Sequence, residues 1–180
     1  ICPRMPARLG YWFFSHLGDL AFLFSSRNST YFQNVRRVLG ADAPSRRVNQ
    51  VARAGFQNQL KNYFDLFRAH SLKPAQIRRQ LADLQGFEHI ERALQAGKGA
   101  IIGSAHFGAW DMIIQIAPLY LGQRVLLPVE RLEPEKLFHY IQKLRGSQGV
   151  EIVPLDHAPR AIIKQLRAGY IVGLAFDRDL

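Results

Sequence analysis

The sequence is poor in cysteine, which limits the kinds of site that it can build. Its 180 residues include one cysteine, Cys2, so neither a disulfide framework nor a cysteine-based zinc site can form within the chain. This composition fits a reducing compartment, and we predict no metal site.

Acidic residues are also scarce, and the resulting positive charge is unevenly distributed. The chain has 24 Lys or Arg against 14 Asp or Glu, a formal net charge of +10. Residues 1–97 hold 14 basic and 6 acidic residues, whereas residues 98–180 hold 10 and 8. The basic half must face something anionic, and anionic lipid and nucleic acid are the two candidates.

A long hydrophobic run is missing as well. The most apolar segment, Leu9–Ser26, is shorter than the roughly 20 residues that a spanning helix needs, and it carries His16 and Asp19 near its middle. No small-residue cleavage site follows it, which argues against a signal peptide. Because it is aromatic and flanked by arginines, a helix lying on the bilayer surface explains it. A helix that covers the domain's own core explains it equally well.

Hydrophobic periodicity predicts a single domain over residues 1–180 that changes character near Gly97. The first part, 1–97, is predicted to be helical, and a long helix in it places an apolar face of Val48, Val51, Ala52, Phe56, Leu60, Phe64 and Phe67 on one side. The predicted helices are Pro3–Ser26, Ser29–Leu39, Ser45–His70, Pro74–Leu84 and Phe87–Ala96.

Apolar runs typical of strands alternate with helical stretches after Gly97. The predicted strands are Ala100–Ala105, Val125–Val129, Val150–Leu155 and Tyr170–Phe176, and the helices between them are Trp110–Leu121, Pro134–Gly146 and Ala158–Ala168. This alternation predicts an α/β fold in which a mainly parallel sheet carries helices on its faces. Residues that follow the strands are then the first candidates for a site.

His106 and Asp111 form the pair with the clearest chemistry. On one continuous helix they would lie about 140° apart and could not touch easily. If His106 ends a strand and Gly108 turns the chain into a helix, Asp111 falls in the first helical turn and can reach back to one ring nitrogen. The other nitrogen is then left as a base. A hydrogen-bonded structural histidine explains His106 about as well from the residues alone.

No enzyme nucleophile accompanies this pair. Ser104 points to the same side of the strand as His106 but does not stand in a GxSxG turn, so we do not expect it to attack a substrate. A base without an enzyme nucleophile has to activate a substrate hydroxyl or a water.

The segment HFGAWD, residues 106–111, resembles the HX4D/E signature of glycerolipid acyltransferases, in the form used by bacterial lipid A lauroyl and myristoyl acyltransferases. The resemblance continues in order through GKGAIIGSAHFGAWD and PVERLEPEKLFHYIQKLRGSQGVEIVPLD. The closing FDRDL is more similar to the phosphatidylinositol mannoside acyltransferase branch.

This resemblance implies an O-acyltransferase that uses His106 as general base and Asp111 as its orienting partner. It places Glu130, Arg145 and Arg178 on the substrate side. The acyl donor would be an acyl-CoA or acyl-carrier-protein thioester, the acceptor a hydroxyl of a membrane glycolipid of the lipid A precursor or phosphatidylinositol mannoside type, and no cofactor would be needed. The expected location is the cytoplasmic face of the bacterial inner membrane, against an anionic surface.

Members of the family usually continue well past the DRD segment, so we expect the chain to be truncated at its C-terminus, which leaves its activity in isolation open. A basic peripheral membrane protein, or a nucleic-acid-binding module without catalysis, is the alternative. The aromatic residues of the first part cluster with aliphatic ones rather than alternating with Lys and Arg, and no nucleic-acid-binding motif occurs, so we expect no nucleic-acid partner.

Overall fold

The computed structural model describes residues 5–69, 71–80, 83, 85–114, 116–131, 133–146 and 149–177. Its contacts divide the chain into two compact units, residues 1–67 and 68–180, and each is described by itself below. The sequence predicted one domain whose character changes at Gly97. Among the residues that the structure describes, strands begin only after that glycine, but the helices between residues 68 and 97 belong to the unit that contains the sheet.

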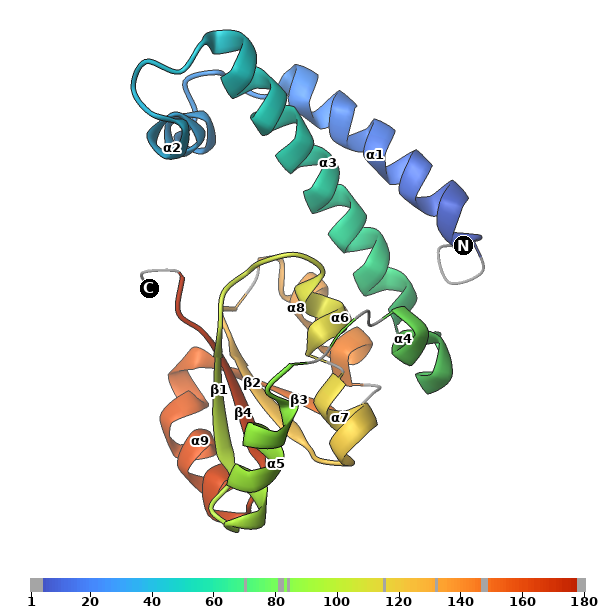
Figure 1. Cartoon of the computed structure of the whole chain (residues 1–180), viewed down its shortest axis with the longest axis vertical. Helices are drawn as coiled ribbons and strands as arrows, with labels where there is room; N and C mark the ends of the chain where they lie inside the picture. Colours follow the sequence, from blue (N-terminus) through green and yellow to red (C-terminus); the bar gives the residue numbers. More distant parts are fainter. Residues whose placement is uncertain are drawn as a thin grey trace. The chain divides into compact units, whose positions relative to one another are not determined.

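The first unit is helical, as the periodicity predicts. Its helices are α1 (Ala7–Phe24), α2 (Thr30–Leu39) and α3 (Ser45–Ala69), the last of which continues two residues past the unit boundary at Phe67. The first two residues of the predicted Pro3–Ser26 helix lie outside the described residues. Helices α1 and α3 lie side by side along most of the length of α1 (Figure 1).

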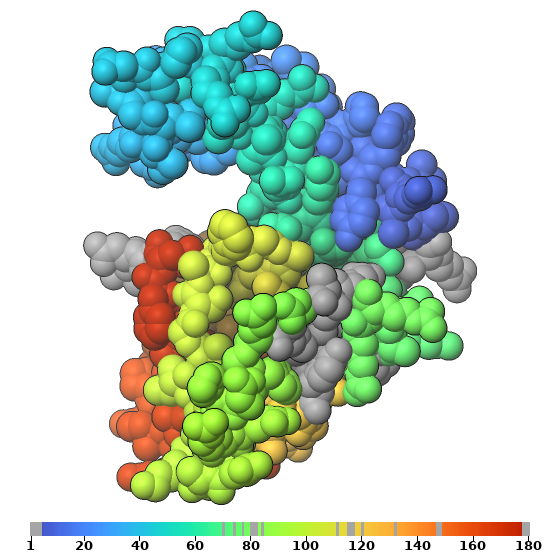
Figure 2. Space-filling view, viewed as in Figure 1, coloured from blue at the N-terminus to red at the C-terminus, as the bar shows by residue number. Residues whose placement is uncertain are grey.

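Small residues and aromatic rings join α1 to α3. The buried residues of α1 are Gly10, Phe14 and Gly18, and the rings of Phe14 and Phe64 lie 5.2 Å apart between their centroids. Phe64 is fully buried, as the predicted apolar face of α3 requires. In the space-filling view the atoms of α1, in blue, lie directly against those of α3, in teal (Figure 2).

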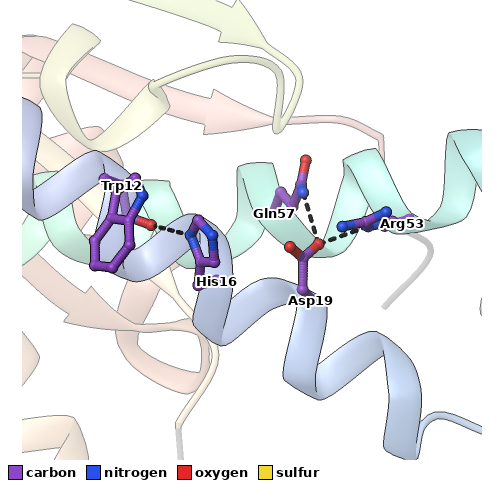
Figure 3. A network of polar contacts seen from close by, with 5 residues as sticks. All are labelled: Trp12, His16, Asp19, Arg53 and Gln57. Atoms are coloured by element: carbon purple, nitrogen blue, oxygen red, sulfur yellow. Dashed lines mark hydrogen bonds and ion pairs between the residues drawn. The ribbon is translucent and has the colours of Figure 1, made fainter.

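A polar network on the same pair of helices accounts for Asp19, which the sequence placed in the middle of an apolar segment. Its Oδ1 accepts hydrogen bonds from Nε of Arg53 at 2.7 Å and from Nε2 of Gln57 at 2.6 Å (Figure 3). The hydrogen bond from Arg53 is the main reason why the pKa of Asp19 falls to about 2. The carboxylate is therefore ionised at neutral pH and ties α1 to α3.

The opposite side of α1 is apolar but exposed. Its large exposed side chains recur at helical spacing and are Leu9, Trp12, Phe13, Leu20, Leu23 and Phe24, which we call the outer face of α1. His16 lies on this face with its ring beside that of Trp12, and its Nδ1 is 2.8 Å from the Trp12 carbonyl oxygen (Figure 3). Within the part of the chain that the structure describes, no helix combines the length and the hydrophobicity that a membrane crossing requires.

The second unit is an α/β layer structure. Helices α4 (Pro74–Gln80) and α5 (Phe87–Gln95) come before the sheet, and residues 81, 82 and 84 of the predicted Pro74–Leu84 helix lie outside the described residues. The strands are β1 (Ala100–Ser104), β2 (Val125–Val129), β3 (Val150–Pro154) and β4 (Ile171–Ala175). All pairs are parallel and the order is β1-β4-β2-β3, which confirms the predicted fold class.

Helices cover both faces of this sheet. Between the strands lie α6 (Trp110–Ile113), α7 (Ile116–Leu121), α8 (Glu135–Gly146) and, after a short 3-10 turn at Leu155–His157, α9 (Ala158–Arg167). The predicted Trp110–Leu121 helix is thus divided into two. Phe138 of α8 packs with Leu127, Val150 and Ile152, whereas α9 lies on the other side of the strands (Figure 1).

The two inner strands carry the most deeply buried part of this core. Ile171 and Val172 of β4 are fully buried, and Leu126 of β2 is 1% exposed. Such near-continuous apolar strands are typical of a parallel sheet covered on both faces. Because the sheet is parallel, the residues that follow each strand gather at one edge, and this edge carries the candidate site.

Candidate active site

Three strands deliver polar side chains to the carboxyl edge of the sheet. His106 follows β1, Glu130 follows β2 directly, and Asp177 follows β4. Ligands of open α/β sheets bind beyond this edge, because the loops that leave the strands there can hold side chains over the sheet. The edge therefore has both the position and the side chains of a functional site.

His106 is held by two hydrogen bonds to one carboxylate. Its backbone N–H donates to Oδ2 of Asp177 at 2.8 Å, and its ring Nδ1 lies 2.9 Å from Oδ1 of the same side chain. The backbone hydrogen bond, followed by that from the ring, keeps the pKa of Asp177 below its usual value. Asp177 is consequently a carboxylate at neutral pH and can only accept these bonds.

A turn between β1 and α6 places the histidine. The strand ends at Ser104, Gly108 has a φ of +63°, and α6 begins at Trp110. A residue with a side chain rarely adopts that φ, which is why a glycine suits this point. The turn that the sequence predicted at Gly108 is therefore present, with His106 in the loop that precedes it.

Trp110 lies between two of the predicted site residues. The His106 and Trp110 rings meet edge to face, with centroids 4.9 Å apart, and the Arg145 guanidinium carbon lies 4.8 Å from the centre of the Trp110 ring. Arg145 comes from the last turn of α8. Contacts of both kinds are favourable for an electron-rich indole, so the tryptophan links the histidine to the arginine.

A mainly apolar cavity of about 460 Å³ opens beside His106. Glu130 and Arg145 also line it, so the structure brings together three of the residues that the sequence singled out. The apolar lining comes from β2, β3, β4 and α8 and includes Leu127, Val129, Phe138, Ile141, Ile152 and Leu174. Cavities of about 300–1,000 Å³ with few polar groups are typical of small-molecule sites.

The other two predicted residues stay predictions. Asp111 belongs to α6, but its side chain is not among the described groups, and Arg178 lies outside the described residues. The structure instead shows Asp177 on the ring nitrogen, a contact that the sequence had assigned to Asp111. Asp177 is visible in the sequence as an acid after a strand, but only the strand order shows that its strand neighbours β1.

Ser104 shows no sign of activation as a nucleophile. Its hydroxyl donates a hydrogen bond to the carbonyl oxygen of Ala105 at 3.2 Å, and the described residues show no contact that would make it acidic. Among those same residues, no cluster of three or more His, Cys, Asp or Glu side chains is suited to a metal ion. The chemistry that this arrangement offers is that of a histidine base beside an apolar cavity.

Comparison with known proteins agrees with this arrangement. In an alignment of 156 residues that covers 82% of this chain, the chain is 31% identical to the phosphatidylinositol mannoside acyltransferases of two Mycobacterium tuberculosis strains, CDC 1551 / Oshkosh and H37Rv, and covers 48% of each. It is 30% identical over 158 residues to the enzyme of that name in Mycolicibacterium smegmatis, and covers 49% of it. The chain therefore spans about half the length of these relatives.

A match to a whole family covers more of the chain than any of these pairwise alignments. Residues 1–180 match the bacterial lipid A biosynthesis acyltransferases from end to end. This agrees with the HX4D segment, the order of the flanking motifs and the α/β fold, and it confirms the resemblance that the sequence suggested. The chain belongs to the bacterial lipid A biosynthesis acyltransferase family.

Proposed function

We propose that this protein is an O-acyltransferase that moves a fatty acyl group from a thioester to a hydroxyl of a membrane glycolipid, with His106 as general base. The observation that carries the proposal is the position of His106 on the wall of an apolar cavity that Glu130 and Arg145 also line. Family membership and three relatives named phosphatidylinositol mannoside acyltransferase support a glycolipid acceptor.

The reaction needs no covalent intermediate on the enzyme. A ring nitrogen of His106 removes the proton of the acceptor hydroxyl as its oxygen attacks the thioester carbonyl carbon. The tetrahedral intermediate then expels the thiolate, the carbon–sulfur bond breaks, and the protonated histidine returns its proton to the sulfur. An ester and a free thiol result. The donor is acyl-CoA or acyl carrier protein, and neither route requires a further cofactor.

The cavity wall suggests how the substrates are divided. The apolar side chains from β2, β3, β4 and α8 suit the acyl chain, because a hydrocarbon gains free energy when it leaves water. Arg145 and Glu130 supply charge on the same wall, and we propose that they orient the acceptor's polar group. Arg178 is proposed for the same side on the family resemblance alone.

The experiment is the substitution His106→Ala in the full-length protein, assayed by release of free thiol from an acyl thioester in the presence of glycolipid. We expect the rate to fall about 100-fold to 10,000-fold, the usual contribution of a general base. His89→Ala is the matched control, because His89 lies on α5, is exposed and does not line the cavity. A His106→Ala rate within a few-fold of wild type would rule out the mechanism.

We also propose that the outer face of α1 rests on an anionic membrane. This face is apolar, and the same unit carries exposed arginines beyond it, among them Arg27, Arg36, Arg37, Arg46 and Arg47. An apolar face combined with basic side chains is typical of helices that lie in the interface of a bilayer. The cytoplasmic leaflet of the inner membrane is the proposed location, because its surface potential is negative.

A further inference from the structure

We propose that Asp177 is the positioning residue that fixes the ring of His106 in the tautomer able to act as base. The proposal rests on the proposed function, because it assigns a role toward the same base. The sequence gave this role to Asp111, five residues after the histidine. Asp177 lies 71 residues away in the chain and comes from a different strand.

Strand pairing brings the two residues together. Strands β1 and β4 are parallel neighbours, with Ser104 opposite Ala175 at the end of the pairing. The ladder continues one step further, because the N–H of Phe176 donates to the carbonyl oxygen of Ser104 at 2.9 Å. His106 and Asp177 each stand two residues beyond that last pair, so the sheet itself sets their approach.

The carboxylate contacts His106 at two points with different donors. Oδ2 accepts the backbone N–H and Oδ1 faces Nδ1, at 2.8 and 2.9 Å. The first bond fixes the orientation of the carboxylate, and the second then fixes the ring. The neighbouring Trp110 ring, whose centroid lies 4.9 Å from that of the histidine, limits the rotation of the histidine from another side.

Proton positions follow from this geometry. An ionised carboxylate has no proton to donate, so Nδ1 of His106 must carry the hydrogen in the contact with Oδ1. In the neutral imidazole the lone pair then lies on Nε2, which is the atom that takes the proton of the acceptor hydroxyl. Asp177 also faces the positive ring that forms during the reaction, and it stabilises that charge.

Replacement by asparagine tests this reasoning closely, because it keeps the shape and removes one acceptor. The backbone N–H of His106 cannot change its role and needs the amide oxygen of Asn. The NH₂ group then faces Nδ1, which must become an acceptor, and the hydrogen moves to Nε2. This tautomer cannot accept the substrate proton. A merely structural contact would not move the hydrogen in this way.

The test compares Asp177→Asn and Asp177→Glu with wild type in the full-length protein, using two measurements. Ring ¹⁵N chemical shifts of histidine-labelled protein report the tautomer, and His106→Ala assigns the signal among the 6 histidines of this chain. We expect Asp177→Asn to change the signal to the Nε2–H form and to lower kcat by about 10-fold to 1,000-fold with little change in KM. Asp177→Glu, which keeps a carboxylate, should recover part of both.

Two controls separate this inference from others. Asp156→Asn, in the 3-10 turn after β3, removes a carboxylate that pairs with Arg131 at 3.3 Å, and it should leave the His106 tautomer unchanged. Asp111→Asn tests the partner that the sequence predicted. If the tautomer changes with Asp111 and not with Asp177, the inference is overturned. A wild-type tautomer in Asp177→Asn overturns it too, even when activity falls.

Failure of the proposed function would look different. If His106→Ala keeps near-normal transferase activity, His106 is not the base and the proposed function fails whatever Asp177 does. If His106→Ala is inactive while Asp177→Asn keeps wild-type kcat and tautomer, the base is right and the role of Asp177 is wrong.

Discussion

Leu23 and Phe24 at the end of α1 offer a quantitative test of membrane binding. Their exposed fractions are 69% and 85%, so neither side chain supports the core of its unit. Full burial of such a side chain is worth about 2 kcal/mol. Scaled by exposure, burial in the bilayer interface contributes about 1.4 kcal/mol for Leu23 and about 1.7 kcal/mol for Phe24. The double substitution to Ser should weaken vesicle binding by about 100-fold.

The assay is cosedimentation with vesicles of phosphatidylcholine containing anionic phosphatidylglycerol, across a salt series. Ile163→Ser is the matched control, because Ile163 is 52% exposed but lies on α9 in the other unit. It should change the dissociation constant less than about 3-fold, the effect expected of a surface substitution away from the interface. Double-variant binding within 3-fold of wild type would refute the assignment of this face.

Charge should contribute separately from the apolar face. Arg36 and Arg37 are both exposed at the end of α2, and each basic residue near an anionic surface is worth about 1 kcal/mol. Changing both to Gln should therefore weaken binding about 30-fold at low salt and much less at high salt. If the protein binds DNA or RNA tightly and does not bind these vesicles, the result would instead favour the nucleic-acid alternative.

Two further predictions concern the contact between α1 and α3. Gly18→Ala gains about 1 kcal/mol of helix propensity, but the new Cβ would stand 2.6 Å from the backbone of Gln57. The backbone has to move to admit this Cβ, at a cost of about 1–3 kcal/mol, so we expect Gly18→Ala to lower the urea midpoint. Gly146→Ala has open space around the new Cβ and should raise the midpoint. A higher midpoint in both variants would contradict the packing of α1 against α3. The pKa of Asp19 is about 2 in the folded chain against an ordinary 3.8, so its contact with Arg53 stabilises the protein above about pH 4 and is lost as the pH falls toward 2. Urea midpoints measured from pH 5 to pH 2 should fall less in Asp19→Asn than in wild type, and parallel curves would show that the contact does not contribute.

Local pattern determined most of the secondary structure. Apolar runs predicted every described strand to within a residue at either end, because a strand buried on both faces needs a continuous apolar sequence. The long helix at Ser45 was found from the spacing of its apolar face. The Trp110–Leu121 helix was predicted as one piece, whereas in the structure α6 ends at Ile113 and α7 begins at Ile116. Pro118 signals this break, because a proline in a helix cannot bond the carbonyl four residues earlier, here that of Ile114.

The sequence by itself determined that His106 follows a strand, that a glycine turn and a helix come next, and that the chain resembles lipid A acyltransferases. The strand, the turn and the helix depend on residues close together in the chain, and the resemblance depends on the order of motifs along it. The strand order was decided only by the tertiary structure, because parallel pairing joins segments whose contact leaves no local signal. That order sets β4 beside β1 and so brings Asp177 to the ring of His106 across 71 residues. The tertiary structure also places Glu130 and Arg145 on the wall of the cavity that His106 lines, so residues that are separate in the sequence form one site.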